Sequence, residues 1–428
     1  MARVVLVVPS TTYRATDFLE AARRRGVEVV VAAEERHVLA GAMGGRFLVV
    51  DLDDPEAAAE AVVAHDARFP VDAVVAVDDR GTTVAAAAAR RLGLAHNPPE
   101  AVAAARDKAV MRGLLEVAEV PQPAYALLPA GAGDDEVRAA VGAVGLPCVI
   151  KPTTLSASQG VLRADDPDEA VAVARRVRAI ADRAGVAPTA PLLVERFVAG
   201  PEVAVEGLLV HGALEVLAVF DKPDPLDGPA FEETIYVTPS RLPAADLAAA
   251  AAALQGACRA MGLSEGAVHG ELRVSGGRAS VVEVAARTIG GLCARALRFR
   301  SGASLEELVL AHALGRPLAE RPAEGASGVL MIPIPSAGLL LGVEGTDAAR
   351  AVAGVTEVDI TVAPGRPVAP PPDGDRYLGF VFAAGPGPAA VEAALRAAGD
   401  RLVVRVEPRP AGDGTTGEPD AGGASRCS

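Results

Sequence analysis

The chain has 428 residues but is poor in lysine, asparagine and tryptophan. It has no Trp and one Asn, Asn97, and only three of its 41 basic side chains are lysines: Lys108, Lys151 and Lys222. A GC-rich genome explains this bias, because the codons of Lys and Asn are AT-rich. Lysines that remain under such a bias are candidates for positions where the planar fork of arginine cannot replace a compact ammonium. The three lysines are therefore the first positions to locate.

Long apolar runs, basic clusters and paired cysteines are also missing. No run of about 18 apolar residues lacks a charge, so a membrane span is not expected. The net charge is −14 and no basic run exceeds Arg23–Arg25, which argues against nonspecific nucleic-acid binding. The four cysteines show no CxxC spacing, which favours free thiols over a disulfide framework or a zinc site. We therefore expect a cytoplasmic protein without nucleic-acid or membrane partners.

Residues 1–95 alternate strand and helix patterns. The segments ARVVLVV, VEVVVAA, RFLVVDL and VDAVVAV are typical of buried parallel strands, and helical stretches lie near 16–25, 55–64 and 82–92. This pattern predicts a small doubly-wound α/β unit. Its first strand is followed by VVPSTTYR instead of G-x-G-x-x-G, and the chain has no G-x-x-x-x-G-K-[ST]. A dinucleotide site, a nicotinamide oxidoreductase and a P-loop are therefore disfavoured.

The rest of the chain divides into further units. From residue 96 the sequence predicts one helix, AVAAARDKAVMRGLLEVAEV, ended by Pro121, then the strand GLPCVIKP, a polar loop and a helix closed by Gly185. Further strands follow, with helices near 244–261 and 304–314, and residues from 325 have a separate α+β pattern. We expect domains at 1–95, 96–320 (lobes 96–185 and 186–320) and 321–410, and a disordered tail at 411–428.

Two lysines lie in contrasting local contexts. Lys151 ends a buried strand in VIKPTTLSASQGV, and Pro152 holds it extended. The small hydroxyl residues and free backbone N–H groups of the loop that follows could fold over phosphate oxygens. A solvated hairpin loop with an incidental lysine explains the segment equally well. Lys108 lies in the helical segment ARDKAVMRGLL, where most lysines are surface residues.

The segment VHGELRVSGGRASVVEVAAR predicts two strands that meet in a hairpin at SGGR. If the apolar residues share the core face, the loop must be of odd length, and that face comprises Leu272, Val274, Val282 and Val284. The opposite face then comprises His269, Glu271, Arg273, Val281, Glu283, Ala285 and Arg287. Glu271 and Glu283 become neighbours that repel unless a cation joins them, and Mg²⁺ suits two such carboxylates. The alternative is an exposed face on which Arg273 and Arg287 neutralise the pair.

The order of these features resembles the ATP-grasp superfamily. A helical lysine, a strand-Lys-Pro with a Ser-rich loop, E-x-F-x-x-G-x-E at 195–202 and two hairpin glutamates followed by Arg and Gly-Gly occur in sequence. Within that superfamily, the segments FEETIYVTPSRLP, VVEVAARTIGGLC, GVLMIPIPSAGLL and YLGFVFA resemble L-amino-acid ligases and related carboxylate–amine ligases. The resemblance covers residues 1 to about 407. It implies an ATP-grasp fold, α/β and α+β, with an N-terminal doubly-wound pre-ATP-grasp domain and a C-terminal α+β domain.

The resemblance also implies roles for individual residues. Lys108 and Lys151 would hold ATP phosphates under a lid that includes Ser156, Ser158 and Gly160. Adenine would meet Glu195, Phe197 and Val198, and ribose would meet Glu202. The metal would lie on Glu271 and Glu283, and Arg287 would contact the transferred phosphate with His269 nearby. The substrates would meet Glu233, through an ammonium group, and Tyr236, Lys222, Gly290 and Gly291. For His269 and Lys222, a structural histidine and an exposed strand-end lysine are the alternatives.

Two residues depart from the family pattern. Ala285 stands where the family usually has a metal-binding Asn, which leaves the number of metals open. Tyr236 stands where the ligases often have His, which leaves the substrates open.

The predicted function is an ADP-forming carboxylate–amine ligase that works through an acyl phosphate, on amino-acid substrates. Its cofactors would be ATP and Mg²⁺, with Mn²⁺ as an alternative ion, and the family is compatible with a homodimer. The rival interpretations are a carboxylase-like or purine-pathway ATP-grasp enzyme and an ATP-binding module without turnover, which Ala285 would favour.

Overall fold

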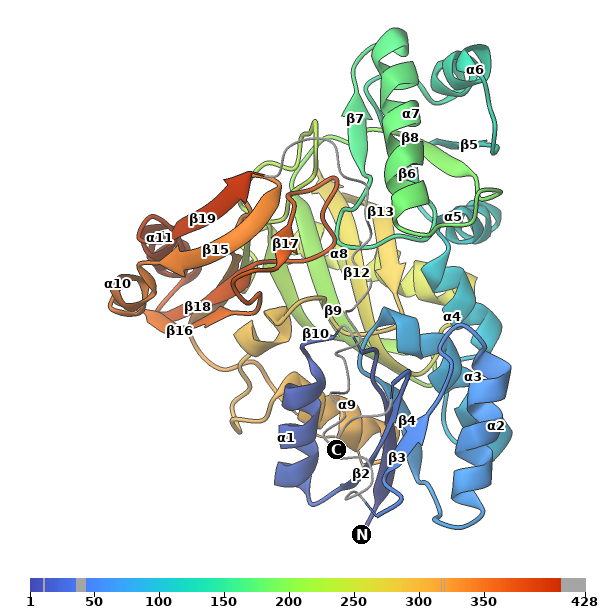
Figure 1. The fold of residues 1–428 in the computed structure, drawn as a ribbon, viewed down its shortest axis with the longest axis vertical. Coiled ribbons are helices and arrows are strands. Elements are labelled where there is room, and N and C mark those ends of the chain that lie inside the picture. Colours follow the sequence, from blue (N-terminus) through green and yellow to red (C-terminus); the bar gives the residue numbers. More distant parts are fainter. Residues whose placement is uncertain (11, 36–43, 317, 319, 409–428) are drawn as a thin grey trace, which may run out of the picture.

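The structure is a computed structural model that describes residues 1–408 except residues 11, 36–43, 317 and 319. The tail predicted to be disordered, 411–428, lies outside the described residues. Three peripheral units surround the long strands of a central sheet (Figure 1). None of the helices in the described ranges has both the length and the apolar character that a membrane crossing requires.

The N-terminal unit is the predicted doubly-wound layer. Its parallel strands lie in the order β3-β2-β1-β4. Val5 and Val7 pack toward α2 and α3, whereas Val4 and Leu6 pack toward α1, because successive side chains of a strand point to opposite faces. The elements are β1 (Arg3–Val7), α1 (Ala15–Arg25), β2 (Glu28–Ala33), β3 (Phe47–Val49), α2 (Pro55–Asp66), β4 (Ala73–Ala76), η2 (Asp79–Gly81) and α3 (Thr82–Leu92).

The next unit carries two of the three lysines on a four-stranded sheet and its leading helices. Its strands lie in the order β5-β8-β6-β7. The single helix predicted from residue 96 is wrong: it breaks at Asp107, whose extended backbone and side-chain carboxylate cap a second helix that starts at Lys108. The elements are α4 (Pro99–Arg106), α5 (Lys108–Val117), β5 (Tyr125–Leu128), α6 (Asp134–Val144), β6 (Cys148–Pro152), β7 (Leu162–Ala164), α7 (Pro167–Arg183) and β8 (Leu192–Arg196).

One eight-stranded sheet forms the centre, in the order β13-β12-β9-β10-β11-β14-β18-β16. It crosses the predicted boundary at 320, because β11 pairs with β14; the predicted domain boundaries themselves stay predictions. The strands are β9 (Glu202–Val210), β10 (Ala213–Asp221), β11 (Ile235–Thr238), β12 (Gly266–Ser275), β13 (Arg278–Ala285), β14 (Ala326–Met331), β16 (Val355–Ile360) and β18 (Gly379–Gly385).

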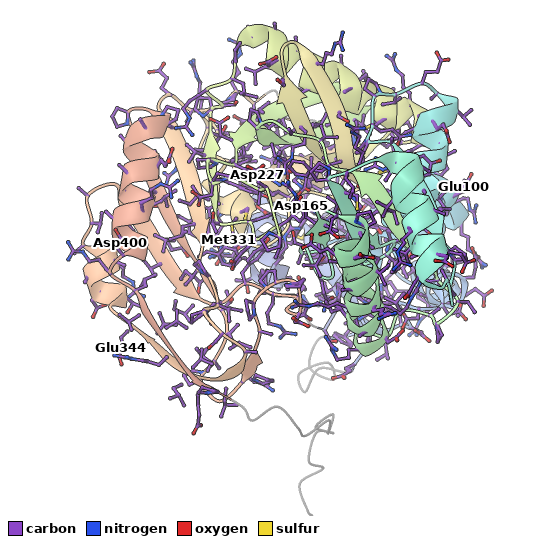
Figure 2. The ribbon with its side chains drawn as sticks, turned by 90° about the horizontal axis from the view of Figure 1, so that it is seen from above. Glu100, Asp165, Asp227, Met331, Glu344 and Asp400 are labelled. Atoms are coloured by element: carbon purple, nitrogen blue, oxygen red, sulfur yellow. The ribbon has the colours of Figure 1, made fainter. Side chains whose placement is uncertain are left out.

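The remaining elements flank this sheet. Met331 ends β14 near the middle of the molecule, whereas Glu344 and Asp400 lie on the outer side of the C-terminal unit (Figure 2). A three-stranded sheet, β17-β15-β19, completes that unit. These elements are α8 (Ala244–Met261), η3 (Cys293–Ala296), α9 (Leu305–Ala313), β15 (Gly338–Glu344), α10 (Thr346–Arg350), β17 (Pro367–Val368), α11 (Pro388–Gly399) and β19 (Val403–Pro408).

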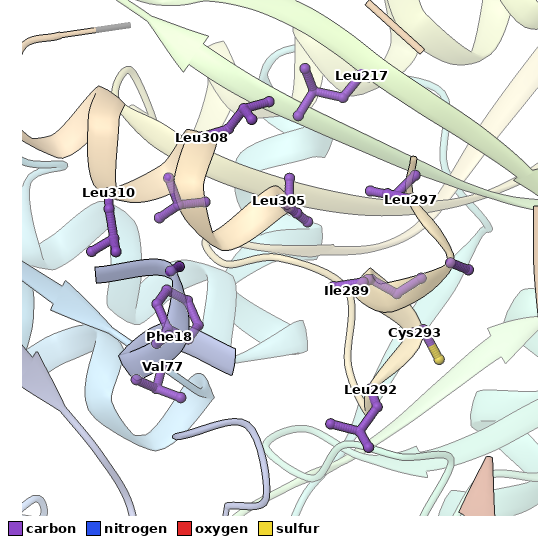
Figure 3. Packing of buried hydrophobic residues seen from close by; sticks show 14 of the residues in the cluster. Phe18, Val77, Leu217, Ile289, Leu292, Cys293, Leu297, Leu305, Leu308 and Leu310 are labelled. Carbon is purple, nitrogen blue, oxygen red and sulfur yellow. The ribbon is translucent and has the colours of Figure 1, made fainter. Parts of the chain in front are cut away.

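A buried apolar cluster joins the N-terminal unit to the segment after β13 (Figure 3). Phe18 of α1 and Val77, which follows β4, pack in the same cluster as Leu305 of α9 and Ile289. Burial of side chains of this size contributes about 1.5–3 kcal/mol each. The cluster therefore fixes the segment that carries Arg287 relative to the edge of the N-terminal sheet.

Candidate active site

The site is built on the hairpin of β12 and β13, where Glu271 is the direct partner of Glu283. The predicted pairing is found, but the odd-length loop is wrong: Gly276 and Gly277 form a two-residue turn, both with positive φ. A bulge after Glu271 pairs Leu272 with Val281 and leaves one extra residue, Val282, before Glu283. Val281 therefore belongs to the core, and Val282 lines a cleft instead.

Lysines, not arginines, lie against this carboxylate pair. Nζ of Lys222 is 3.2 Å from Glu271 Oε1, and Nζ of Lys108 is 3.3 Å from Glu283 Oε1. Arg273 pairs with Glu202 and Arg287 with Asp79, so the predicted alternative of an arginine-neutralised exposed face is wrong.

A narrow cleft of about 90 Å³ opens on one side of the pair, between the lysine-bearing unit and the central sheet. It brings together residues predicted to hold the nucleotide, from four separate segments of the chain. These are Lys108, Lys151, Ser156, Ser158, Glu195, Phe197, Val198 and Glu202, with Glu271 and Glu283. Gly160 does not line it; its φ is +71°, and its N–H donates to Pro372 O at 2.8 Å.

Both lysines at the cleft are buried, contrary to the surface alternative for Lys108. Lys108 is 6% exposed and donates to Leu155 O at 2.7 Å, which ties it to the loop after β6. Nζ of Lys151 lies 2.8 Å from Glu195 Oε2. Burial lowers the pKa of Lys151, and Glu195 opposes that effect.

Arg112 is a functional neighbour that the sequence did not single out. It is fully buried, its Nε lies 2.6 Å from Glu195 Oε1, and it donates to the carbonyls of Val281 and Val282. Burial alone would raise the pKa of Glu195, but Arg112 and Lys151 lower it to about 2. Arg112 stands four residues after Lys108 on one helix face, and that spacing was the available signal. The Glu195 side chain thus positions Lys151, and its predicted adenine contact stays a prediction.

Lys222 lies inside a cage of three carboxylates and is not an exposed strand-end lysine. Its Nζ is 2.7 Å from Glu202 Oε1, 2.5 Å from Glu233 Oε1 and 3.2 Å from Glu271 Oε1, and 5.1 Å from the centre of the Tyr236 ring. Burial opposes its charge, but the three carboxylates together raise its pKa well above the ordinary value. One oxygen of each of the three carboxylates lies within 4.8 Å of the others, a spacing that metal ligands would have. In this structure the Lys222 ammonium lies among them.

Glu233 is held by two tyrosines as well as by Lys222. Tyr236 donates to Oε1 at 2.6 Å and Tyr377 of the C-terminal unit donates to Oε2 at 2.8 Å. Burial raises the pKa of Glu233, with Lys222 opposing. Tyr377 was missed, although tyrosine is rare: of four in the chain, Tyr13, Tyr236 and Tyr377 line one cavity.

That cavity, of about 790 Å³, lies on the other side of the carboxylate pair. The central sheet, the lid loop and the N- and C-terminal units all contribute to its wall. Among the predicted residues it is lined by Ser156, Ser158, Glu233, Tyr236, His269, Glu271, Glu283, Arg287, Gly290 and Gly291.

Arg287 is held from the N-terminal unit. Its Nη2 lies 2.8 Å from Asp79 Oδ2, and its Nη1 donates to Thr288 O at 2.8 Å. Its Nε is buried without a hydrogen-bond partner in the described part of the chain. Asp79 was missed; it follows β4 at the carboxyl edge of a parallel sheet, where ligand-binding residues concentrate.

His269 is buried and paired on both ring nitrogens, which fits the structural alternative, and its direct role in catalysis stays a prediction. Its Nδ1 bonds Glu206, which also accepts the backbone N–H of Ile289 at 3.0 Å, and its Nε2 is 3.4 Å from Glu271. Burial lowers the pKa of His269, but Glu206 and Glu271 outweigh burial and raise it to about 9. Protonated His269 therefore donates toward Glu271.

Glu271 and Glu283 fit a magnesium ion. Their carboxylates border both the cleft and the cavity, and their ammonium neighbours lie at 3.2–3.3 Å, beyond the ordinary length of about 2.7–2.9 Å for a charge-assisted bond. Lone pairs are therefore available, and two carboxylates plus water are what Mg²⁺ requires. Ala285, which pairs with His269, adds no ligand.

Comparison with known proteins identifies the family to which the chain belongs. Family models match in order: an ATP-grasp N-terminal domain at 19–96, an ATP-grasp domain at 144–296 and an L-amino acid ligase C-terminal domain at 330–407. D-alanine–D-alanine ligase of Gloeobacter violaceus is 31% identical over 220 residues, which are 48% of this chain and 67% of that one. The chain belongs to the ATP-grasp superfamily. Within it, the chain is a carboxylate–amine ligase by fold and family.

Two further relatives narrow the group within the ATP-grasp superfamily. The crystal structure of L-amino acid ligase from Bacillus licheniformis matches 95% of this chain and 99% of its own, with 25% identity and a TM-score of 0.76. Alanine–anticapsin ligase of Bacillus subtilis is 29% identical over 258 residues, 56% of this chain but only 53% of that protein. The present chain therefore spans about half the length of alanine–anticapsin ligase. The solved biotin carboxylase domain of 2-oxoglutarate carboxylase from Hydrogenobacter thermophilus holds ADP with magnesium; at 15% identity and a TM-score of 0.67, over 94% of this chain and 90% of its own, it is alike in fold alone.

Proposed function

We propose that this protein uses ATP to join a carboxylate to an amine, releasing ADP and phosphate, with amino acids as substrates. The observation that carries the proposal is the Glu271–Glu283 pair at the junction of the narrow cleft and the large cavity. Such a junction is where the terminal phosphate of a nucleotide in the cleft would meet a carboxylate in the cavity. The ligase-type C-terminal domain favours this function over a carboxylase-like or purine-pathway enzyme.

The nucleotide would lie in the cleft with its phosphates toward the carboxylate pair. Lys108 and Lys151 offer two ammonium groups to the phosphates, and the lid loop offers the hydroxyls of Ser156 and Ser158. The adenine end would reach Phe197 and Val198, and Glu202 would accept from ribose hydroxyls after release from Lys222. Positioning and charge neutralisation, rather than a covalent enzyme intermediate, would account for catalysis.

Glu271 and Glu283 would hold one Mg²⁺, or Mn²⁺, with water and phosphate oxygens completing the shell. The ion would supply charge neutralisation on the transferred phosphoryl group.

The acid would react in the cavity. Its carboxylate attacks the terminal phosphate and gives an acyl phosphate, which Arg287 neutralises. The lid loop excludes the water that would hydrolyse it. An amine then attacks the acyl carbon and expels phosphate. Glu233 would face an ammonium group of the acid in the cavity that Tyr236, Gly290 and Gly291 also line.

The test is acid-dependent ADP formation by Glu283→Gln, with the acids and amines found by a phosphate-release screen. We expect a loss of about 100-fold or more in kcat with an unchanged circular dichroism spectrum, because the substitution removes one carboxylate of the ion site. A variant with wild-type turnover would overturn the assignment. Asp347→Asn, on exposed α10, is the matched control and should be fully active.

A further inference from the structure

One carboxylate of the large cavity forms no ion pair with any lysine or arginine in the described part of the chain. Six of the seven carboxylates that line it lie within 4 Å of a Lys or Arg nitrogen: Asp53, Asp79, Glu233, Glu271, Glu283 and Asp375. The seventh is Asp78, for which no cationic nitrogen lies that close among residues 1–408 as far as the structure describes them. A cationic ligand would be the first cationic partner of Asp78, whereas at each of the other six it would share the carboxylate with a protein cation already in place.

The structure holds Asp78 in place without neutralising it. Its Oδ1 accepts the backbone N–H of Asp79 at 2.7 Å, and its Oδ2 accepts the hydroxyl of Thr12 at 3.1 Å. These bonds fix the carboxylate two residues after β4, at a position that lines the cavity.

Asp78 also lines the same cavity as Arg287, the residue that would hold the acyl phosphate. The next residue, Asp79, pairs with Arg287, and the charge of Asp78 is near enough to that guanidinium to add to the rise in its pKa, after Asp79. An amine must approach the acyl carbon at about 3–3.5 Å to react. The carboxylate adjoining the Arg287 anchor is therefore in the right region for the nucleophile, while Glu233 serves the acid from a different segment.

We propose that Asp78 binds the protonated amino group of the amine substrate, which makes the N-terminal unit the nucleophile's site. This inference rests on the proposed ligase function. One N–H proton passes to Asp78, and the nitrogen lone pair forms the C–N bond. The C–O bond to phosphate breaks, and the departing phosphate takes the second N–H proton. Asp78 then returns its proton to solvent.

The test compares two nucleophiles in the Asp78→Asn protein. Through its Oδ1, Asn can still accept the backbone N–H of Asp79, so the cap of η2 survives. Its Nδ2 can donate to the Thr12 hydroxyl in place of accepting from it, and the substitution removes the charge. Hydroxylamine is uncharged at neutral pH and traps an acyl phosphate as a hydroxamate without needing a counter-ion. We expect hydroxamate formation within about twofold of wild type and a KM for the amino-acid amine raised about tenfold or more.

Asp53→Asn is the matched control, because Asp53 lines the same cavity from the same unit but is paired with Arg80. It should leave both reactions unchanged. An unchanged amine KM in Asp78→Asn, or an equal loss of activity with both nucleophiles, would overturn the role proposed for Asp78 and leave the ligase function standing. If the wild-type protein forms no hydroxamate with any acid, the ligase function fails and this inference fails with it.

Discussion

Single residues in the site are organised as charge pairs that a nucleotide would rearrange. Lys222 pairs with three carboxylates, and each of them has a second predicted role, toward ribose, ammonium or metal. A compact ammonium fits among three carboxylates where a guanidinium fork would not. This arrangement gives a physical reason for a lysine that survives in a chain of 38 arginines.

His269 predicts a pH dependence of stability. Its pKa is raised from 6.5 to about 9 on folding, so its contribution is complete below pH 6.5 and is lost as the pH rises through about 9. For a buried group this shift corresponds to roughly 3 kcal/mol. We expect the free energy of unfolding in urea to fall between these pH values in the wild type, and to fall much less in His269→Gln. Parallel curves for the two proteins would contradict the assignment.

Only some of the residues that form the site could be predicted from the sequence. Lys108, Lys151, Glu271 and Glu283 follow from local patterns and their order. Arg112, Asp79 and Tyr377 were missed, because a helix spacing, a strand end and a rare tyrosine do not mark a site until the partner is known, and each partner lies more than 80 residues away. Tertiary contact, not local sequence, gives these three their roles.

At the level of elements, two details of backbone geometry decide where the charges lie. Asp107 ends α4 and caps α5, which places Lys108 in the first turn and buries it. The turn of the hairpin has two residues, and the extra residue at the Val282 bulge shifts the register so that Glu283 lies opposite Glu271 on the same face of the sheet. The sequence predicted one long helix because the residues on both sides of Asp107 favour helix. It predicted a loop of odd length because no residue in the hairpin sequence signals the bulge.

The cap at Asp107 is testable. Its carboxylate accepts from the backbone N–H groups of Ala109 and Val110 at 2.9 and 3.4 Å. Asp107→Ala should lower the free energy of unfolding by about 1 kcal/mol and raise the KM for ATP, because the start of α5 frays around Lys108. Asp107→Ser keeps a capping oxygen and should restore both quantities. Equal behaviour of the Ala and Ser variants would show that the cap does not position Lys108.

On the scale of the whole molecule, the C-terminal unit contacts the loop predicted to be the lid and the helix that follows that loop. Asp373 pairs with Arg176 and Arg183 of α7, at 3.1 and 2.7 Å, and Pro372 O accepts the N–H of Gly160. Exposed ion pairs of this kind contribute little to folding, typically below about 1 kcal/mol. Their effect should instead fall on lid closure over the acyl phosphate.

Asp373→Asn should therefore uncouple the reaction without unfolding the protein. We expect the ratio of phosphate released to amide formed to rise several-fold, because water reaches the acyl phosphate, while the unfolding midpoint moves little. Asp347→Asn removes an exposed pair of similar type on α10 and should leave the ratio unchanged. A ratio that stays at one phosphate per amide in Asp373→Asn would exclude a latch role.

The fold as a whole was largely predictable, since alternating patterns and motif order indicate the doubly-wound unit and the ATP-grasp core. The continuity of the central sheet through β11 and β14 was not, because pairing between strands so far apart leaves no local mark. That continuity brings Tyr377 to Glu233 and so brings the C-terminal unit into the substrate cavity.

The acyl phosphate is the central claim, and the fate of the carboxylate oxygen tests it most directly. The acid substrate is labelled with heavy oxygen in its carboxylate, the wild-type protein turns it over with ATP and the amine, and the phosphate released is analysed by mass spectrometry. One labelled oxygen should appear in each phosphate, because the acid's own oxygen bridges to phosphorus before the amine displaces it. Amide formation with unlabelled phosphate would contradict the mechanism.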